Sequence, residues 1–213
     1  MRVLISGASG LVGTELQKQL IELGHTPVEL VRRTPKAPNE VQWEPALLQI
    51  DESVMDTVDA VVNLAGATTG KLPWTREYKK ELIASRINST RTLVQAIAKA
   101  KKRPTVLISG SASGIYGDCG DTLLTESSPK GEGFLADLAH AWEREAMKAP
   151  KGVRVVLIRT TMVLSRKLGA LGRLLPILRL GIGGKLGNGK QWWAWISLPD
   201  EARAIIHLIN TTS

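Results

Sequence analysis

Three glycines near the start of the chain have the spacing that lets a peptide backbone approach a phosphate. Gly7, Gly10 and Gly13 stand as G-x-x-G-x-x-G, directly after the apolar run Arg2–Ser6 and before a stretch with helical periodicity. The first glycine permits the tight bend, the second admits a pyrophosphate, and the third lets helix and strand pack closely. Free N–H groups at the helix N-terminus then attract the negative charge. The pattern predicts dinucleotide binding, and a merely tight strand–helix turn is the alternative.

Two adjacent arginines follow the second apolar run. Val28–Val31 has the character of a strand, and Arg32 and Arg33 come directly after it. In dinucleotide-binding folds an acidic residue at this point binds the ribose 2′-hydroxyl of NAD, whereas an arginine accommodates the 2′-phosphate of NADP. The guanidinium fork matches phosphate oxygens. The pair therefore favours NADP(H), although Glu29 lies nearby and a solvated pair at a strand end is the alternative.

Small and hydroxylated residues end two further strands. Leu64, Ala65 and Gly66 follow the buried run that starts at Asp59, and small residues there let a cofactor lie over the strand end. Close packing against a helix is the alternative reading of these three.

Ser109, Ser111 and Ser113 lie at the end of the strand that begins at Thr105. Open α/β sheets bind ligands at this edge, so Ser111 is the candidate catalytic residue, in contact with substrate or nicotinamide. The run GSASG does not match the nucleophile elbow of hydrolases, because its serine is second. The histidines show no metal-ligand spacing, and we expect no metal.

The elements that must position these groups alternate along the chain. Strands are expected at 2–6, 28–31, 59–64, 105–109 and 153–159, with a short one near 41–43, and helices at 14–23, 76–101, 134–147 and 200–209. Such alternation predicts an α/β fold with a doubly wound parallel sheet, the Rossmann fold. After Arg159 the sequence becomes rich in Gly and Leu, and then contains Trp192, Trp193 and Trp195. We expect a Rossmann domain over 1–165 and a partial substrate lobe over 166–213, whose last helix is a candidate to return to the Rossmann core.

Composition narrows the class of protein. The 213 residues carry a net charge of +8, but the basic residues are scattered apart from a cluster at a helix end, so we expect no nucleic acid partner. No apolar stretch is long enough for a transmembrane span, and we expect no membrane association. A single cysteine, Cys119, excludes an intrachain disulfide and is typical of a reducing compartment, so we expect a cytoplasmic protein. The oligomeric state is not indicated.

Several segments resemble a known group of proteins. The turn, the middle strand and the serine run are similar to those of extended short-chain dehydrogenases/reductases: GASGLVG, DAVVNLAG and ISGSASGIYGD. Three longer segments resemble its atypical members, the NAD-dependent epimerase/dehydratase-like family, which is sugar-nucleotide epimerase-like and also described as cell-division-inhibitor-like: LPWTREYKKELIASRINSTRTLV, VVLIRTTMVLS and LGIGGKLGNGKQWWAWISLPDEA. Together these segments span nearly the whole chain.

The resemblance implies an NADP-binding Rossmann domain and suggests the cofactor contacts. These are Gly7, Ala8, Ser9, Gly10, Leu11, Val12 and Gly13 of the turn, then Arg32, Arg33, Leu64 and Ala65, and also Glu81 and Arg86 of the next helix. Glu81 and Arg86 are polar positions on a helix whose other face is core, so a solvated face is the alternative for them.

The chain departs from the superfamily pattern in two ways. Catalytic members use a Tyr and a Lys four residues apart on the helix that here begins at Phe134, and no Tyr-x-x-x-Lys occurs in it. The family also continues into a C-terminal segment that completes the substrate lobe, so we expect this chain to be a fragment or a truncation. The tryptophans and the Gly-rich run 181–189 would lie near that lobe, or serve as core partners for the missing part.

Two functions follow as hypotheses. The first is an NADP(H)-binding oxidoreductase or epimerase-like enzyme that acts on an unknown small substrate, with a nucleotide sugar as one candidate. The alternative is a non-catalytic NADP(H)-binding protein that senses redox state or serves as a scaffold, because the Tyr-x-x-x-Lys pair is absent.

Overall fold

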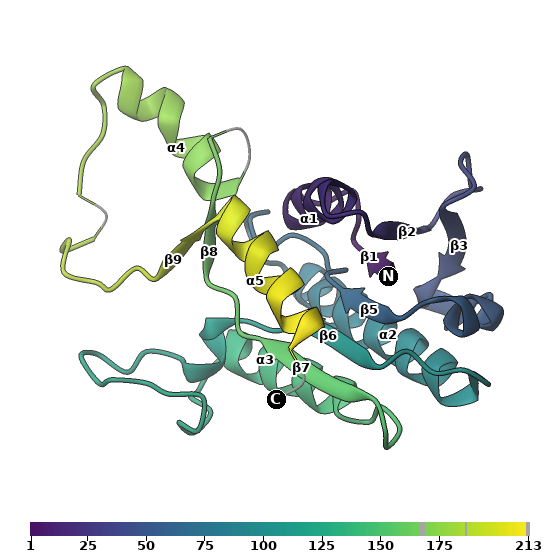
Figure 1. Ribbon diagram of the computed structural model, residues 1–213. Helices are drawn as coiled ribbons and strands as arrows, with labels where there is room; N and C mark the ends of the chain where they lie inside the picture. The colour runs from purple at the N-terminus through teal and green to yellow at the C-terminus, as the bar shows by residue number, and fades with distance from the viewer. Residues whose placement is uncertain (167–168, 186, 212–213) are drawn as a thin grey trace.

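The chain folds around one twisted sheet covered by helices on both faces (Figure 1). The computed structural model describes residues 1–166, 169–185 and 187–211. The sheet has the strand order β4-β3-β2-β1-β5-β6-β7. These strands are β1 (Arg2–Ser6), β2 (Thr26–Val31), β3 (Glu40–Glu44), β4 (Gln49–Ile50), β5 (Ala60–Asn63), β6 (Val106–Gly110) and β7 (Arg154–Ile158). All neighbouring pairs are parallel except β3–β4. The predicted α/β fold with a doubly wound, mostly parallel sheet is confirmed.

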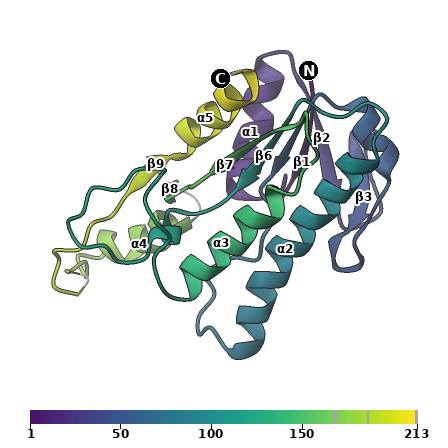
Figure 2. The same cartoon turned by 90° about the horizontal axis from the view of Figure 1, so that it is seen from below.

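The helices cover the sheet in two layers (Figure 2). Helices α1 (Leu11–Glu22) and α5 (Leu198–Asn210) lie on one face, and α2 (Arg76–Lys99) and α3 (Phe134–Ala146) lie on the other. Successive side chains of β1 point to opposite faces of the sheet. Val3 and Ile5 pack with α1 and α5, whereas Leu4 packs with α2. Burial on both faces explains the continuous apolar runs of the central strands.

Helix α5 belongs to the packing of the sheet although it lies late in the chain. Its residues Ala202, Ile205, Ile206 and Ile209 share a buried cluster with α1 and with the central strands. Ser197 caps its N-terminus by accepting a hydrogen bond from the amide of Asp200.

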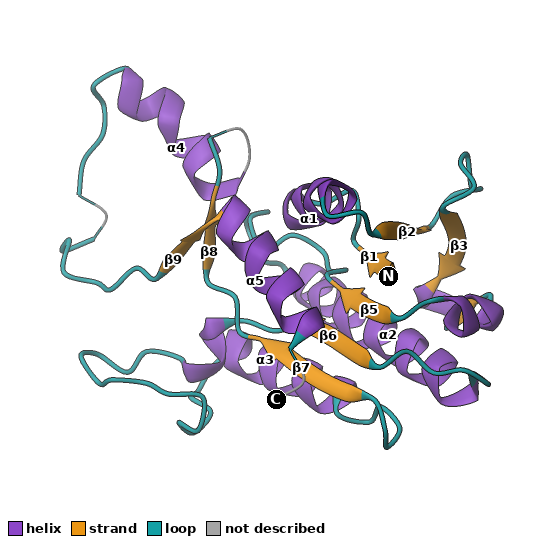
Figure 3. Cartoon of the chain, viewed as in Figure 1, coloured by secondary structure: helices purple, strands orange, loops and turns teal. Residues whose placement is uncertain are grey.

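A small excursion separates β7 from α5. It contains β8 (Met162–Leu164), α4 (Gly169–Arg179) and β9 (Trp195–Ser197), and β8 pairs with β9 in parallel. Figure 3 shows α4 projecting away from the helical layers. The sequence predicted no helix or strand here. Pro176 inside α4 and strands of three residues leave too little periodicity to recognise. Within the expected segment 166–213, positions 167–168, 186 and 212–213 lie outside the described residues.

Candidate functional site

The glycine turn has a backbone that only glycine accommodates. Gly7 has φ +71°, and a Cβ at that position would lie 2.7 Å from the carbonyl oxygen of Leu64. A Cβ on Gly13 would lie 2.8 Å from the Cα of Ala8. The turn therefore packs directly against the end of β5 and against its own backbone, and side chains are excluded from both places.

The N-terminus of α1 points out of this turn without a side-chain cap. The helix begins at Leu11, three residues earlier than the sequence predicted, since Gly13 forms part of the first turn. The N-cap is Gly10, whose amide donates to the carbonyl of Gly7 at 2.9 Å. No described side chain caps the helix, so its first amides and the positive end of its dipole remain for an anion.

The other turn residues differ in exposure. Ala8 is buried, and its carbonyl accepts a hydrogen bond from the side chain of Gln17 at 2.9 Å. Ser9 is exposed, and Val12 is partly buried against the cluster beneath α1. The turn thus has a fixed inner side and an open outer side.

A buried chain of hydrogen bonds fixes the carboxyl ends of β1 and β5. The hydroxyl of Ser6 donates to the side-chain oxygen of Asn63 at 2.6 Å and accepts from the amide of Ala65 at 3.3 Å. The amide group of Asn63 donates to Thr90 at 2.8 Å, and the indole N–H of Trp142 donates to the same hydroxyl at 2.9 Å. These bonds tie two strands to α2 and α3 and hold Leu64–Gly66 in place beside the turn.

Arg86 lies over this strand end. Its guanidinium donates to the carbonyl of Ala67 at 3.1 Å and lies 5.2 Å from the ring of Trp142. Burial lowers the pKa of Arg86. A Cβ on Gly66 would lie 3.1 Å from the guanidinium carbon of Arg86. The absence of a side chain at Gly66 therefore lets Arg86 approach the backbone there. The structure thus brings Gly66 and Arg86 together, whereas Glu81 is exposed on the same helix.

The two arginines after β2 have different surroundings. Both are exposed, but Arg33 donates to both carboxylate oxygens of Glu40, at 2.7 and 2.6 Å. This contact, together with a hydrogen bond from the amide of Lys36, lowers the pKa of Glu40 to about 2. Arg32 has no hydrogen bond or ion pair with the described residues.

Ser111 lies in a buried polar network rather than at a surface. Its hydroxyl donates to Glu143 of α3 at 2.6 Å, and the same carboxylate accepts two hydrogen bonds from Arg159, at 2.8 and 3.0 Å. Burial raises the pKa of Glu143, but the hydrogen bonds from Arg159 and Ser111 outweigh it, so the pKa lies below its ordinary value. Arg159 also donates to the hydroxyl of Tyr116 at 2.7 Å.

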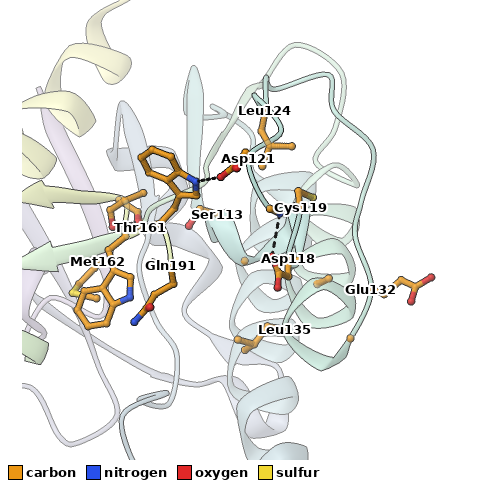
Figure 4. Close-up of a pocket in the computed structure, with 18 of the residues that line it drawn as sticks. Ser113, Asp118, Cys119, Asp121, Leu124, Glu132, Leu135, Thr161, Met162 and Gln191 are labelled. Carbon is orange, nitrogen blue, oxygen red and sulfur yellow. Dashed lines mark hydrogen bonds between the residues drawn. The ribbon is translucent and has the colours of Figure 1, made fainter. Parts of the chain in front are cut away.

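A pocket of about 1070 Å³ lies beyond this network, between the loop that follows β6 and the segment before β9 (Figure 4). Ser113 lines it, and so do Phe134, Leu135 and Ala136 at the start of α3. Its other walls include Trp74, Asp118, Cys119, Asp121, Leu124, Thr161, Met162, Gln191, Trp192 and Trp193. The indole N–H of Trp192 donates to Asp121 at 2.6 Å and joins the two sides.

The sequence did not identify most residues of this pocket. The loop after β6 has neither helical nor strand periodicity, and its side chains meet the tryptophan segment only in the folded chain. The grouping of Trp192 and Trp193 was the available signal. Of the three serines at the strand end, the pocket is lined by Ser113 and not by Ser111.

The model of the NAD dependent epimerase/dehydratase family matches residues 3–213. The chain belongs to this family. The resemblance expected from the sequence is confirmed.

Relatives in this epimerase family cover nearly all of the chain. Epimerase family protein ML0860 of Mycobacterium leprae is 39% identical over 212 residues, which are 99% of this chain and 68% of that protein. The chloroplastic SDR39U1 homolog of Arabidopsis thaliana is 37% identical over 221 residues, and the match covers 100% of this chain and 63% of that protein. The chain thus spans about two thirds of the length of these relatives.

Solved structures of family members have the same fold. Human epimerase family protein SDR39U1, crystallised with NADPH, superposes with a TM-score of 0.90 at 32% identity, over 99% of this chain and 70% of that one. A nucleoside-diphosphate sugar epimerase from Corynebacterium glutamicum gives a TM-score of 0.87 at 36% identity, over 100% of this chain and 44% of that one.

No helix among the described residues is long and apolar enough to cross a membrane. They also contain no group of three or more His, Cys, Asp or Glu side chains placed to hold a metal ion.

Proposed function

We propose that this family member binds NADP(H) at the carboxyl edge of β1, β2 and β5. The observation that carries the proposal is the glycine turn at the uncapped N-terminus of α1: Gly7 and Gly13 pack against backbone, and Ser9 and Gly10 are exposed on its outer side. This turn suits a pyrophosphate, because the first amides of α1 are free to donate to an anion there. The NADPH in the human relative's crystal structure supports the choice of cofactor.

Further contacts in the proposal follow the edge of the sheet. Residues Gly7–Gly13 hold the pyrophosphate, with Ser9 and Gly10 on its open side. We assign the 2′-phosphate to the arginine pair Arg32 and Arg33, which follows β2, and the floor beside Gly7 to Leu64–Gly66. Arg86 presents a guanidinium over that floor, and Glu81 is the outermost candidate contact.

The pocket beyond β6 is the proposed substrate site. NADP(H), when bound, donates or accepts a hydride. Ser113 offers a hydroxyl within the pocket, while Ser111 positions Glu143 and the start of the loop. The wall that α3 contributes, Phe134 to Ala136, is apolar. We propose an oxidoreductase or epimerase-like reaction on a small substrate, with a nucleotide sugar as a candidate.

A non-catalytic NADP(H)-binding protein is the second candidate. The specific observation in its favour is that Leu135 and Ala136 of α3 line the pocket, while this helix carries no Tyr-x-x-x-Lys pair to supply a proton. Such a protein would sense the redox state of its cofactor or act as a scaffold.

Titration with NADPH tests the cofactor proposal. Gly13→Ala places a methyl group against the backbone of Gly7 and Ala8 and must displace the turn, so we expect at least about a tenfold loss of NADPH affinity. Gly184→Ala is the matched control, since a Cβ there meets nothing within 4 Å. Circular dichroism verifies that both variants fold. Equal affinity of Gly13→Ala and wild type would contradict the proposed role of the glycine turn.

Turnover separates the two candidate functions. The protein is incubated with NADPH or NADP⁺ and panels of carbonyl compounds, alcohols and nucleotide sugars, and the nicotinamide absorbance and sugar products are followed. Turnover that is lost in Ser113→Ala supports the enzyme. Tight NADPH binding without any hydride exchange or epimerised product supports the non-catalytic protein.

A further inference from the structure

The two arginines at the end of β2 are adjacent in sequence but unequal in charge environment. Arg33 uses two nitrogens to bind Glu40 in a fork, and it also donates to the carbonyl of Thr34 at 3.0 Å. Arg32 makes no hydrogen bond or ion pair with any described residue. The sequence presents a doublet, whereas the structure presents one compensated and one uncompensated cation.

Glu40 is held in place by the backbone around it. It opens β3 and pairs in register with Glu29 of β2. Its carboxylate also accepts a hydrogen bond from the amide of Lys36 at 2.6 Å, and its side chain is only 9% exposed. The loop 34–39 therefore folds around this carboxylate and keeps it beside Arg33, and the carboxylate stays ionised at neutral pH because its pKa is lowered.

A carboxylate in this position has a consequence for phosphate recognition. A ribose 2′-phosphate carries close to two negative charges at neutral pH, and a fixed anion within a few ångströms repels it. Arg33 can attract that phosphate only against the field of Glu40. Among the described residues, no carboxylate forms an ion pair with Arg32.

We propose that Glu40 is a specificity-determining residue that neutralises Arg33 and leaves Arg32 to recognise the 2′-phosphate of NADP(H). This inference rests on the proposed function, since it divides roles within the proposed cofactor site. Glu40 acts in two ways: it fixes the loop after β2, and it limits how strongly the site prefers a phosphorylated ribose over a free 2′-hydroxyl.

The alternative is that Glu40 orients Arg33, and that the Arg33 guanidinium binds the 2′-phosphate through the edge that does not face Glu40. The two possibilities predict opposite effects of neutralising Glu40. Neutralising Glu40 would then weaken NADPH binding, whereas under our proposal it strengthens NADPH binding.

The test measures dissociation constants for both NADPH and NADH in wild type, Arg32→Ala, Arg33→Ala and Glu40→Gln. We expect Arg32→Ala to lose about tenfold or more in NADPH affinity, the equivalent of one charge-assisted hydrogen bond, and to keep its NADH affinity. Arg33→Ala should change both affinities alike, and Glu40→Gln should bind NADPH several-fold more tightly with NADH unchanged, as expected when one repulsive charge is removed. Lys151→Ala, an exposed cation before β7 at the opposite edge of the sheet, is the charge-matched control.

Each outcome decides between the possibilities. Loss of NADPH preference in Arg33→Ala but not in Arg32→Ala overturns the division of roles, as does weaker NADPH binding by Glu40→Gln. Equal affinity of wild type for NADPH and NADH overturns this inference and leaves dinucleotide binding standing. Failure of wild type to bind either cofactor removes the proposed function and the inference together. Because Arg32 contacts no described residue, Arg32→Ala remains informative even if Glu40→Gln is unstable.

Discussion

Ser111 and Ser113 show how two neighbouring hydroxyls come to have separate roles. Ser111 is 6% exposed and donates to Glu143, while Ser113 lines the pocket two residues later. The backbone changes course between them, because β6 ends at Gly110 and the short helix η3 (Ser113–Tyr116) begins three residues later. The first serine therefore belongs to the core and the second to the pocket wall.

Alanine substitutions should separate these two roles. Ser111→Ala removes a buried hydrogen bond to a carboxylate, so we expect a loss of about 1–3 kcal/mol in the free energy of unfolding. Ser113→Ala should stay within about 0.5 kcal/mol of wild type, as surface substitutions do, and should reduce any substrate turnover. Urea unfolding and the turnover assay measure the two effects. A destabilised Ser113→Ala with unchanged Ser111→Ala would reverse the assignment.

The sequence correctly predicted that the candidate serines lie at the carboxyl end of a strand of the sheet. It could not show which of them faces the pocket. Parallel strands in a doubly wound sheet bring their carboxyl ends together, and this rule depends only on the order of elements. Which serine faces outward depends on Glu143 and Arg159, which lie 32 and 48 positions away from Ser111 in the chain. Likewise, the partner of Arg33 becomes visible only when β3 pairs with β2.

At the level of elements, the Glu143–Arg159 ion pair joins α3 to the end of β7. The carboxylate side chain is 8% exposed and the guanidinium side chain 24% exposed. Breaking a buried pair on one side leaves an uncompensated charge, which costs about 3–5 kcal/mol. The pair therefore holds α3, whose first residues line the pocket, against the end of β7, the strand that follows it in the chain.

The stability that Glu143 contributes should depend on pH with a definite sign. Its pKa is lower in the folded chain than in the unfolded chain, so the contribution is complete above the unfolded value of 4.5 and is lost as the pH falls through the folded pKa. We expect Glu143→Gln to be less stable than wild type at neutral pH and the difference to shrink in acid. Urea unfolding at a series of pH values measures this, and a difference that stayed constant down to the most acidic pH would argue against the ion pair.

The secondary structure was predictable where burial is continuous. The predicted strand at 2–6 agrees residue for residue with β1, and the helices at 76–101 and 134–147 agree with α2 and α3 to within two residues. Each of these elements buries a long apolar face. Strands β8 and β9 have three residues each, which is too short for an alternating pattern to be recognised. Trp192 and Trp193, just before β9, are exposed.

For the whole molecule, the division proposed from composition places the Rossmann domain at 1–165 and a partial lobe at 166–213. Helix α5 packs on the sheet beside α1. Its end is held as well, because Arg154 of β7 donates to the carbonyl of Leu208 at 2.7 Å. We therefore propose that α5 completes the Rossmann layer, while the excursion from β8 to β9 forms the base of the lobe.

Two shortened chains test this division. A chain of residues 1–165 exposes Val3, Ile5, Leu16 and Leu20 on one side of the sheet, which removes cover from four fully buried side chains. At roughly 1.5–3 kcal/mol per side chain, that loss rivals the stability of a typical domain. We expect this chain to lack a cooperative thermal transition by circular dichroism, and a chain in which a short Gly-Ser linker replaces residues 166–194 to retain one. Cooperative unfolding of the 1–165 chain would show that α5 is dispensable.

The contact between α1 and α5 also governs when the chain can fold. The side chain of Gln19 donates to the carbonyl of Pro199, across 180 positions of sequence. During synthesis, α1 emerges from the ribosome early and its partner only after almost all the other elements. The part of the α1 face that α5 covers must therefore stay exposed until α5 has been synthesised, and exposed apolar surface on a nascent chain favours aggregation. A shortage of chaperone during expression should harm this protein more than one whose neighbouring helices are also neighbours in sequence.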